Sequence, residues 1–441
     1  MQGRGRVHKR RDGGGGPKLP TLPFVVCLMR LRLLLQVLVS ALLVAPPSLI
    51  GQEEGADSAP RRRSASLDLG VDQVGLSIGN SPRWTGLRLN FADRHVEQID
   101  GLNLTLWYHK RGNEDARYNG ISLGLLPTGG AFHGLSVGIL GAVADRAMEG
   151  VSVAGLGLVS DGDLTGLQVA GLGLVADGTL RGIGVAGLGL VTDRRIEGIG
   201  IGGLAAVAEG PVQGIVVGGL ATVTGGVQGI TAGGLAVVTD GGLDGIGIGG
   251  LATVADGTVH GLALGGLAVV AGGRVQGIAI GGLATVASGP IEGISIGGLA
   301  TVADGSIDGI TINGLATVAD GSITGIAVGG IGVVADDQLI GLGLTAGDLR
   351  AVHALTGLGI GAYRVKSRAV SGAAIAAIWT NLRTLRGLSI AGYNQVMEQR
   401  GLAIGLFNYA RELHGMQIGV LNYAGNNSGV AKVLPVVNAH F

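Results

Sequence analysis

The sequence predicts an all-β protein, specifically a repetitive β-solenoid, from its composition, its period and its turn residues. Glycine makes up 88 of the 441 residues, hydrophobic residues 46% and aromatic residues 3%. That is too apolar for a disordered chain, and the strict Gly-X-Y period of collagen is missing. Glycines recur every 16 residues from Gly134 to Gly357, with a single spacing of 15 between Gly214 and Gly229. A fixed short period of this kind indicates a repeat architecture.

The repeat unit reads approximately G-[IL]-x-[IV]-G-G-L-A-x-V-A-D-G-x-[IVL]-x, as in GITINGLATVADGSIT at 309–324. We number its positions 1 to 16 from the starting glycine. Two apolar runs alternate with two turn signals, Gly-Gly and Asp-Gly, which favour tight turns and accept positive φ. Helix is excluded because each unit holds three or four glycines, each costing about 1 kcal/mol in a helix. Each unit is therefore expected to form one coil of two short strands.

Stacked coils place identical positions in columns about 4.8 Å apart, and a strict period preserves such columns. The alternative is an antiparallel meander closed as an outer-membrane β-barrel, and the terminal Phe441 resembles the aromatic ending of such barrels. The strands of the unit are shorter than the roughly 9–11 residues of a membrane strand, and the array lacks aromatic girdles. We therefore favour the solenoid. The apolar residues at positions 15 and 2 differ in parity, which predicts a bulge or bend at the starting glycine.

Composition divides the chain into five segments. Met29 is followed by two arginines, an apolar run and a Pro-containing polar end, which is the order of a secretory signal, so Met29 is the expected true start. Beyond the array the period shortens to 14 at Gly387, Gly401, Gly415 and Gly429, and aromatic residues return. The expected segments are a signal peptide region (1–51), a linker (52–66), an N-terminal β lead-in or cap (67–133), the 16-residue repeat array (134–372), and C-terminal 14-residue repeats with a cap (373–441).

The formal net charge of zero hides an uneven distribution. Residues 1–51 contain eight Lys and Arg and one acidic residue, which leaves 23 basic and 30 acidic residues, a net charge of −7, for the remainder. A mildly acidic body argues against a nucleic-acid partner. The single cysteine, Cys27, precedes the apolar run of the signal, so the mature chain is expected to contain neither disulfides nor a reactive thiol.

An acidic residue recurs at position 12, the Asp of Asp-Gly. The column comprises Asp145, Asp161, Asp177, Asp193, Glu209, Asp240, Asp256, Asp304, Asp320 and Asp336. Stacked carboxylates supply the oxygen ligands that Ca²⁺ prefers, and the candidate cation column is Asp256, Asp304, Asp320 and Asp336. Asp before Gly is also the expected residue of a turn, and the column is interrupted at Gly225, Gly272 and Ser288. We favour the corner interpretation.

Three further patterns have structural explanations. A threonine column (Thr222, Thr253, Thr285, Thr301, Thr317) resembles the flat arrays of ice-binding solenoids, but it is single and interrupted by Val269. GIGIGG at 198–203 and 245–250 matches a dinucleotide fingerprint without the following helix that such a site needs. The histidines after residue 51, which are His95, His109, His133, His260, His353, His414 and His440, show neither metal spacing nor a catalytic triad pattern. No catalytic residue and no cofactor are assigned.

The C-terminal repeats GLAIGLFNYA and GMQIGVLNYA, with the closing segment VLPVVNAHF, carry a resemblance to a known family. They resemble bacterial surface-repeat proteins of the leptospiral type, whose units read approximately G-[LV]-Q-[IL]-G-L-[LI]-N. The resemblance is close over residues 387–441. It implies an exported, envelope-associated protein and assigns no catalytic residue.

Together these patterns predict an exported β-repeat protein with a structural or interaction role, such as adhesion, and without catalysis. The expected location is the cell surface, outer membrane or periplasm of a bacterium. The expected partner is a protein, a glycan or another envelope component, with membrane association included and nucleic acid excluded. The alternative function is that of an outer-membrane pore.

Overall fold

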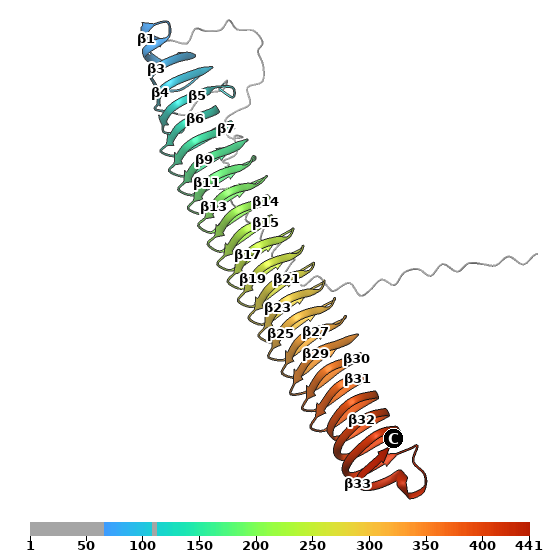
Figure 1. The fold of residues 1–441 in the computed structure, drawn as a ribbon. Helices are drawn as coiled ribbons and strands as arrows, with labels where there is room; N and C mark the ends of the chain where they lie inside the picture. The colour runs from blue at the N-terminus through green and yellow to red at the C-terminus, as the bar shows by residue number, and fades with distance from the viewer. Residues whose placement is uncertain (1–65, 108–112) are drawn as a thin grey trace, which may run out of the picture. The chain divides into compact units, whose positions relative to one another are not determined.

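The computed structural model describes residues 66–107 and 113–441, so the predicted signal region and the linker up to residue 65 lie outside it. The described residues form one stack of coils (Figure 1). Each coil pairs in parallel with the coils before and after it, as Gly309 does with Gly293 and with Gly325. The predicted β-solenoid is therefore confirmed, and the antiparallel meander is wrong. Within the described residues, no helix has the length and apolar character to cross a membrane.

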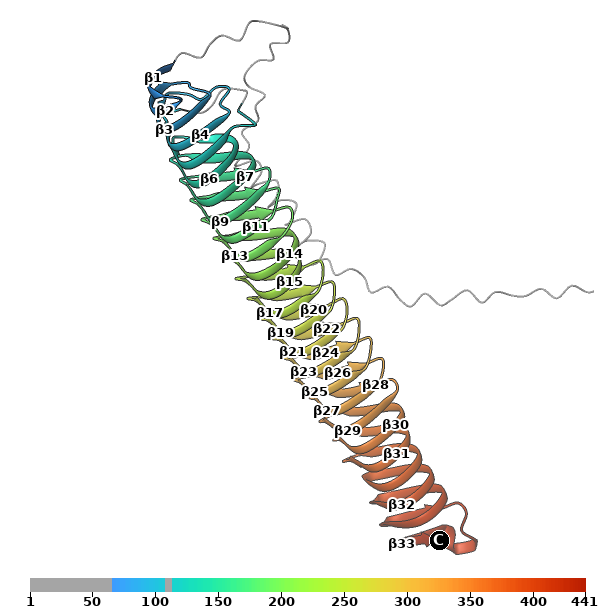
Figure 2. The same ribbon diagram turned by 45° about the horizontal axis from the view of Figure 1, so that its top comes forward.

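Most coils of the array consist of a long strand over positions 15 to 5 and a short strand over positions 8 to 11. Figure 2 brings the short strands into view opposite the long ones. The long strands are β9 (Asp163–Ala170), β11 (Leu180–Ala186), β13 (Ile196–Gly202), β17 (Leu243–Gly249), β19 (Val259–Gly265), β21 (Val275–Gly281), β23 (Ile291–Gly297), β25 (Ile307–Asn313), β27 (Ile323–Gly329) and β29 (Gln338–Thr345). The short strands are β8 (Gly157–Ser160), β10 (Gly173–Ala176), β12 (Gly189–Thr192), β16 (Ala236–Thr239), β18 (Ala252–Ala255), β20 (Ala268–Ala271), β22 (Ala284–Ala287), β24 (Ala300–Ala303), β26 (Ala316–Ala319) and β28 (Gly332–Ala335).

In the remaining coils the strand continues through the second corner. These strands are β7 (Gly141–Ala154), β14 (Ala205–Gly218), β15 (Ala221–Gly233), β30 (Asp348–Gly361), β31 (Arg364–Ala376) and β32 (Trp379–Ala424). The N-terminal coils use β2 (Val74–Gly79), β3 (Arg83–Asn90), β4 (Gln98–Thr105), β5 (Arg117–Gly124) and β6 (Thr128–Gly138). Each end carries an antiparallel strand, β1 (Ser66–Val71) against β2, and β33 (Val433–His440), after a 3₁₀ turn at Gly429–Lys432, against β32. The two antiparallel strands cover the outermost parallel edges, which would otherwise present unpaired backbone groups.

The starting glycine adopts a positive φ, but the β-ladder passes through it in unbroken register, so the predicted bulge is absent at Gly309. This glycine has a positive φ in every coil from Gly75 to Gly415; φ is 138° at Gly309. A Cβ on Gly309 would lie 2.0 Å from the carbonyl oxygen of Gly293 in the coil before. Glycine is therefore required by both the φ angle and the close approach of neighbouring coils. Gly429 was expected to continue the 14-residue spacing, but its φ is 57° and it belongs to the turn before β33.

Small side chains fill the inside of the coil. In the coil 309–324, the buried residues are Thr311, Asn313, Thr317, Ala319 and Ile323, at positions 3, 5, 9, 11 and 15. Only position 15 regularly holds a large aliphatic side chain. The two sheets can therefore lie close together, and the coil closes within 16 residues.

Large aliphatic side chains at positions 2, 4 and 7 point outward. Ile310, Ile312 and Leu315 are 36, 47 and 42% exposed. Positions 15 and 2 therefore face opposite sides of the long strand, as ordinary strand alternation requires, so their parity difference is no evidence for a bulge or bend.

The two turn pairs do not use the positive φ that their residues accept. Neither Gly203 of the Gly-Gly corner nor Gly321 of the Asp-Gly corner adopts it. Gly203 is needed for space instead, because a Cβ there would lie 1.9 Å from the carbonyl oxygen of Gly187. The 15-residue spacing is absorbed at the acidic corner, where the register shifts between Ala208 and Pro211.

Candidate functional site

The acidic column lies at the corner after each short strand, and we call this side of the coil the acidic corner. Asp304 and Asp320 are exposed. Their backbone N–H groups donate to the carbonyls of Ala287 and Ala303 in the preceding coil, at 3.0 and 3.1 Å. The parallel ladder thus continues through the corner, and the carboxylates project outward from it. Asp320 occupies a corner, as its place before glycine suggests.

The carboxylates of the acidic corner influence one another. Partial burial, followed by the negative charge of Asp177, raises the pKa of both Asp161 and Asp193 above its usual value, and Glu209 adds to the effect on Asp193. Partial burial, followed by the charge of Asp240, raises the pKa of Asp256. The column is therefore a row of like charges that repel one another at neutral pH.

The geometry gives the cation hypothesis no support. Nowhere in residues 66–107 and 113–441 do three His, Cys, Asp or Glu side chains come together in a way that could hold a metal ion. Of the candidate cation column, Asp256 is separated from the other three by Gly272 and Ser288, while Asp304, Asp320 and Asp336 occupy successive corners.

The threonine column points into the coil rather than toward solvent. Thr222, Thr253, Thr285, Thr301 and Thr317 are all 0% exposed. The Thr253 hydroxyl donates to the carbonyl of Leu264 in the next coil at 2.6 Å, and the N–H of Gly249 donates to the same hydroxyl at 3.0 Å. Thr222, Thr285 and Thr317 likewise donate to backbone carbonyls of the next coil, whereas Thr301 donates to Asn313 Oδ1. All five hydroxyls are buried, so they present no surface on which ice or ordered water can form.

The outward aliphatic residues recur coil after coil along the stack, and we call them together the aliphatic face. Its members are at least 36% exposed and repeat along the stack at positions 2, 4 and 7. They include Val151, Leu167, Ile183, Ile201, Leu204, Ile215, Leu220, Ile230, Leu235, Ile248, Leu251, Leu267, Ile278, Leu283, Leu299, Ile310, Ile312, Leu315 and Ile326. Exposed apolar patches larger than a few hundred Å² are rare on monomeric soluble proteins and mark interaction sites.

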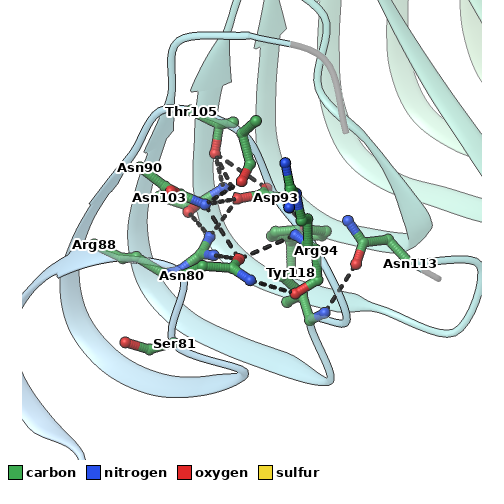
Figure 3. Close-up of polar contacts among 12 residues, drawn as sticks. Asn80, Ser81, Arg88, Asn90, Asp93, Arg94, Asn103, Thr105, Asn113 and Tyr118 are labelled. Carbon is green, nitrogen blue, oxygen red and sulfur yellow. Dashed lines mark hydrogen bonds and ion pairs between the residues drawn. The ribbon is translucent and has the colours of Figure 1, made fainter. Parts of the chain in front are cut away.

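A buried polar network lies between the N-terminal coils (Figure 3). Arg88 is 0% and Asp93 4% exposed. Arg88 Nη1 donates to Asp93 Oδ1 at 2.7 Å and to Asn103 Oδ1 at 2.8 Å. The hydroxyl of Tyr118 donates to Asp93 Oδ2 at 2.9 Å, and Thr105 Oγ1 donates to the same carboxylate at 3.1 Å. Burial, followed by the charge of Asp93, raises the pKa of Tyr118 well above its usual value.

Sequence reasoning missed this network because LRLNF at 87–91 alternates in the usual way, with leucines apparently facing inward. The structure reverses that pattern. Arg88 stands two residues after Gly86, at position 3, so it points inward like the small residues of the array, and Phe91 is 64% exposed. The position relative to the starting glycine is the signal that identifies Arg88 as buried.

The histidines remain dispersed, with one exception. The rings of His414 and His440 lie 6.0 Å apart in an edge-on arrangement that their sequence separation does not suggest. His260 lies 3.4 Å from Asp244 and His353 lies 3.3 Å from Asp337, both pairs on exposed positions of neighbouring coils. The GIGIGG segments lie in the long strands β13 and β17, where glycines serve the coil and no phosphate-binding helix follows.

The parallel stack, the glycine column and the inward small residues define the protein as a β-solenoid. Comparison with protein-family models, with curated proteins and with solved structures finds no match. The surfaces of the coils therefore carry the functional argument.

Proposed function

We propose that this chain is an exported, envelope-associated β-solenoid with a structural or interaction role, and that its aliphatic face packs against the same face of a second copy. The aliphatic face is the observation that carries the proposal. The leader after Met29 and the resemblance of residues 387–441 to surface-repeat proteins support export. The protein acts by binding and assembly rather than as an enzyme, and the pore alternative is abandoned along with the antiparallel meander.

The aliphatic face is large enough for a stable dimer. Measured along the backbone and around the Gly-Gly corner, positions 2 to 7 cover about 16 Å at 3.3 Å per residue, and the coils between Gly134 and Gly341 extend about 65 Å at the spacing of parallel strands. The product, about 1,000 Å², exceeds the roughly 800 Å² that each partner contributes to an interface of standard size.

A second copy matches this face better than other occupants do. Its side chains repeat with the same period of one strand spacing, so the rows of two copies interdigitate along their whole length. Position 16, beside the aliphatic face, is often acidic in the array, as at Glu197, Asp244 and Glu292, which disfavours anionic lipid. The equivalent place holds Arg386 and Arg400 in the C-terminal coils, so antiparallel packing brings basic coils toward the partner's acidic coils.

The test is the mass of the mature chain in solution, measured by sedimentation equilibrium or light scattering over a range of concentrations. The expected result is a dimer that dissociates in Leu251→Glu and remains in Thr258→Glu. Leu251 is 41% exposed on the aliphatic face, and Thr258 is exposed in the same coil beyond the acidic corner. A wild-type chain that is monomeric at tens of micromolar overturns the second copy as the occupant. Binding to neutral lipid vesicles by that monomer identifies a membrane surface instead.

Export is tested separately. The full chain and a version that begins at Met29 are expressed in a bacterium with two membranes, and the cells are fractionated. Both versions are expected in the envelope with the same new N-terminus after the apolar run, as determined by mass spectrometry. An unprocessed chain that stays in the cytoplasm contradicts the export part of the proposal and leaves self-association unaffected.

A further inference from the structure

The charge of the solenoid changes sign toward the C-terminal end of the array. Between residues 134 and 340 the chain holds 17 acidic and 5 basic residues, whereas residues 341–400 hold 7 basic and 2 acidic residues. Arg350, Lys366, Arg368 and Arg383 in this second segment line a hollow of about 580 Å³, which we call the basic hollow. It lies over those parts of β30, β31 and β32 that correspond to the short strands of the array, on the opposite side of the coil from positions 2 and 4.

The β-ladder brings these four cations close to one another. Arg350 is paired in register with Lys366. Arg368 and Arg383 occupy equivalent places in adjacent coils, between the paired residues Ser367–Leu382 and Ala369–Thr384. Neighbouring strands lie about 4.8 Å apart, and alternate residues on one face of a strand lie about 7 Å apart. The four charges therefore form a compact cluster across three coils.

Nothing in the described part of the chain neutralises the cluster by a close ion pair. Within the described residues, none of the four cations has a carboxylate within ion-pair distance, whereas Arg364 on the same strand pairs with Asp348 and Arg181 pairs with Asp163. Glu398, Arg411 and Glu412 also line the hollow, so the lining carries five basic and two acidic side chains. The net charge of the lining is therefore +3.

The fold does not require these cations. The place of Arg350 is occupied by Val334 in the preceding coil, with which it is in register, and by Val318 one coil earlier. Arg368 follows the inward Ser367 as Asp336 follows Ala335 in the array. Like charges directly opposite each other on neighbouring strands are destabilising. Arg350 and Lys366 thus replace the valines of the array although their charges repel each other. We interpret this departure from the repeat as evidence for an anionic ligand that offsets the repulsion.

We propose that the basic hollow binds an acidic polysaccharide through anionic groups spaced along its sugar chain. Arginine and lysine recognise sulfate, phosphate and carboxylate groups through charge-assisted hydrogen bonds. None of the described residues lining the hollow is aromatic, so the stacking platform with which proteins bind single-stranded nucleic acid is missing. The hollow therefore recognises the charge and the spacing of anionic groups rather than nucleic-acid bases.

The test measures binding of fluorescently labelled dextran sulfate and alginate oligosaccharides to the mature chain by anisotropy. The two glycans distinguish sulfate from carboxylate recognition, and a labelled oligothymidylate of similar charge tests for nucleic acid. The variant combines Arg350→Val with Lys366→Val, which restores the valine column of the array. The matched control combines Arg194→Ala with Arg195→Ala, two exposed arginines outside the hollow.

At least one glycan is expected to bind in a salt-dependent manner, with an affinity that falls about tenfold or more in the Arg350→Val, Lys366→Val variant and less than about threefold in the control. The melting temperature of the variant is expected to equal or exceed that of the wild type, since like charges are removed, so lost binding does not reflect lost folding. The proposal is overturned if neither glycan binds, if the control loses as much affinity as the variant, or if oligothymidylate binds more tightly than both glycans.

Discussion

The repeat array and the C-terminal coils use different residues to donate a hydrogen bond to the same backbone carbonyl at the corner. In the array, Thr253 donates its hydroxyl to the carbonyl of Leu264, at position 4 of the next coil. In the C-terminal coils, the side-chain amide of Asn408 donates to the carbonyl of Ile418, also at position 4 of the next coil, at 2.9 Å. The acceptor is common to both regions, so the corner itself creates the need for a buried donor.

The asparagines also form hydrogen bonds with one another along the stack. Asn394 donates to Asn408 Oδ1 at 2.8 Å, and Asn408 donates to Asn422 Oδ1 at 2.7 Å. The result is a buried ladder along the stack, formed by the asparagine of the G-L-A-I-G-L-F-N pattern. A threonine has a single hydroxyl proton and forms no such ladder. We infer that the C-terminal coils are more strongly linked to one another than the coils of the array.

The largest expected effect concerns the feature that the two regions share. Gly309→Ala and Gly401→Ala place a Cβ 2.0 and 2.2 Å from the carbonyl oxygens of Gly293 and Gly387, and φ is 138° at both glycines. Each substitution is expected to destabilise the local coils by about 4 kcal/mol or more, because strain and a backbone clash combine. Amide hydrogen exchange of the flanking coils, together with urea unfolding, measures the loss.

Gly332→Ala is the control for these two substitutions. Its Cβ would lie 3.7 Å from the nearest atom, the carbonyl oxygen of Asp348, and Ala316 occupies the equivalent place one coil earlier. We expect a change below about 1 kcal/mol. A Gly332→Ala effect as large as that of Gly309→Ala would show that the glycine column has no special role.

The second prediction separates the two regions. Asn408→Val removes the hydrogen bonds that the Asn408 side chain forms with Asn394, with Asn422 and with the carbonyl of Ile418. The free energy of unfolding is therefore expected to fall by about 3 kcal/mol. Thr253→Val removes one hydroxyl and is expected to cost about 1 kcal/mol, since Val237 and Val269 already hold the adjacent places of that column. Thermal and urea unfolding of both variants provide the comparison, and equal losses would contradict the stronger linkage of the C-terminal coils.

The stacking could be predicted from the sequence because it follows from a fixed period, whereas the parity of the apolar residues gave no valid reason for a bend at the starting glycine. The inward face could not be predicted. Ile and Leu at positions 2, 4 and 7 are more hydrophobic than the Thr and Ala that fill the coil, so a rule that places the most apolar residues inside selects the wrong side. A narrow coil excludes large side chains from most inward positions, and volume outweighs hydrophobicity there.

Of the candidate sites, one could be predicted from the sequence and the other could not. The acidic corner is visible in the sequence, since Asp before Gly marks a turn. The basic hollow is not, because Arg350 and Lys366 are 16 residues apart, and only the register of β30 and β31 makes them neighbours. Arg88 was hidden for a related reason, since its burial depends on its distance from Gly86 and not on its polarity.

The smallest expected effect comes from removing one carboxylate from the acidic corner of the array or from the basic hollow. Asp177→Asn removes the carboxylate that contributes to the raised pKa values of Asp161 and Asp193. We expect the free energy of unfolding to rise by a few tenths of a kcal/mol at pH 7, the range of exposed charge pairs. Glu398→Gln is the counterpart in the basic hollow, where a carboxylate among arginines is favourable, so the same measurement is expected to fall by a similar amount.

The pH dependence distinguishes repulsion from a local packing effect. An acid whose pKa is raised in the folded chain binds its proton more tightly there than in the unfolded chain, so its stabilising contribution is present at low pH and is lost as pH rises through the folded pKa. The advantage of Asp177→Asn over the wild type should therefore shrink as pH falls from 7 toward 4, when Asp161 and Asp193 become protonated. It should also shrink in about 1 M salt, which screens exposed charges. An advantage that is the same at pH 4 and pH 7 would assign the effect to the side-chain amide rather than to repulsion along the acidic corner.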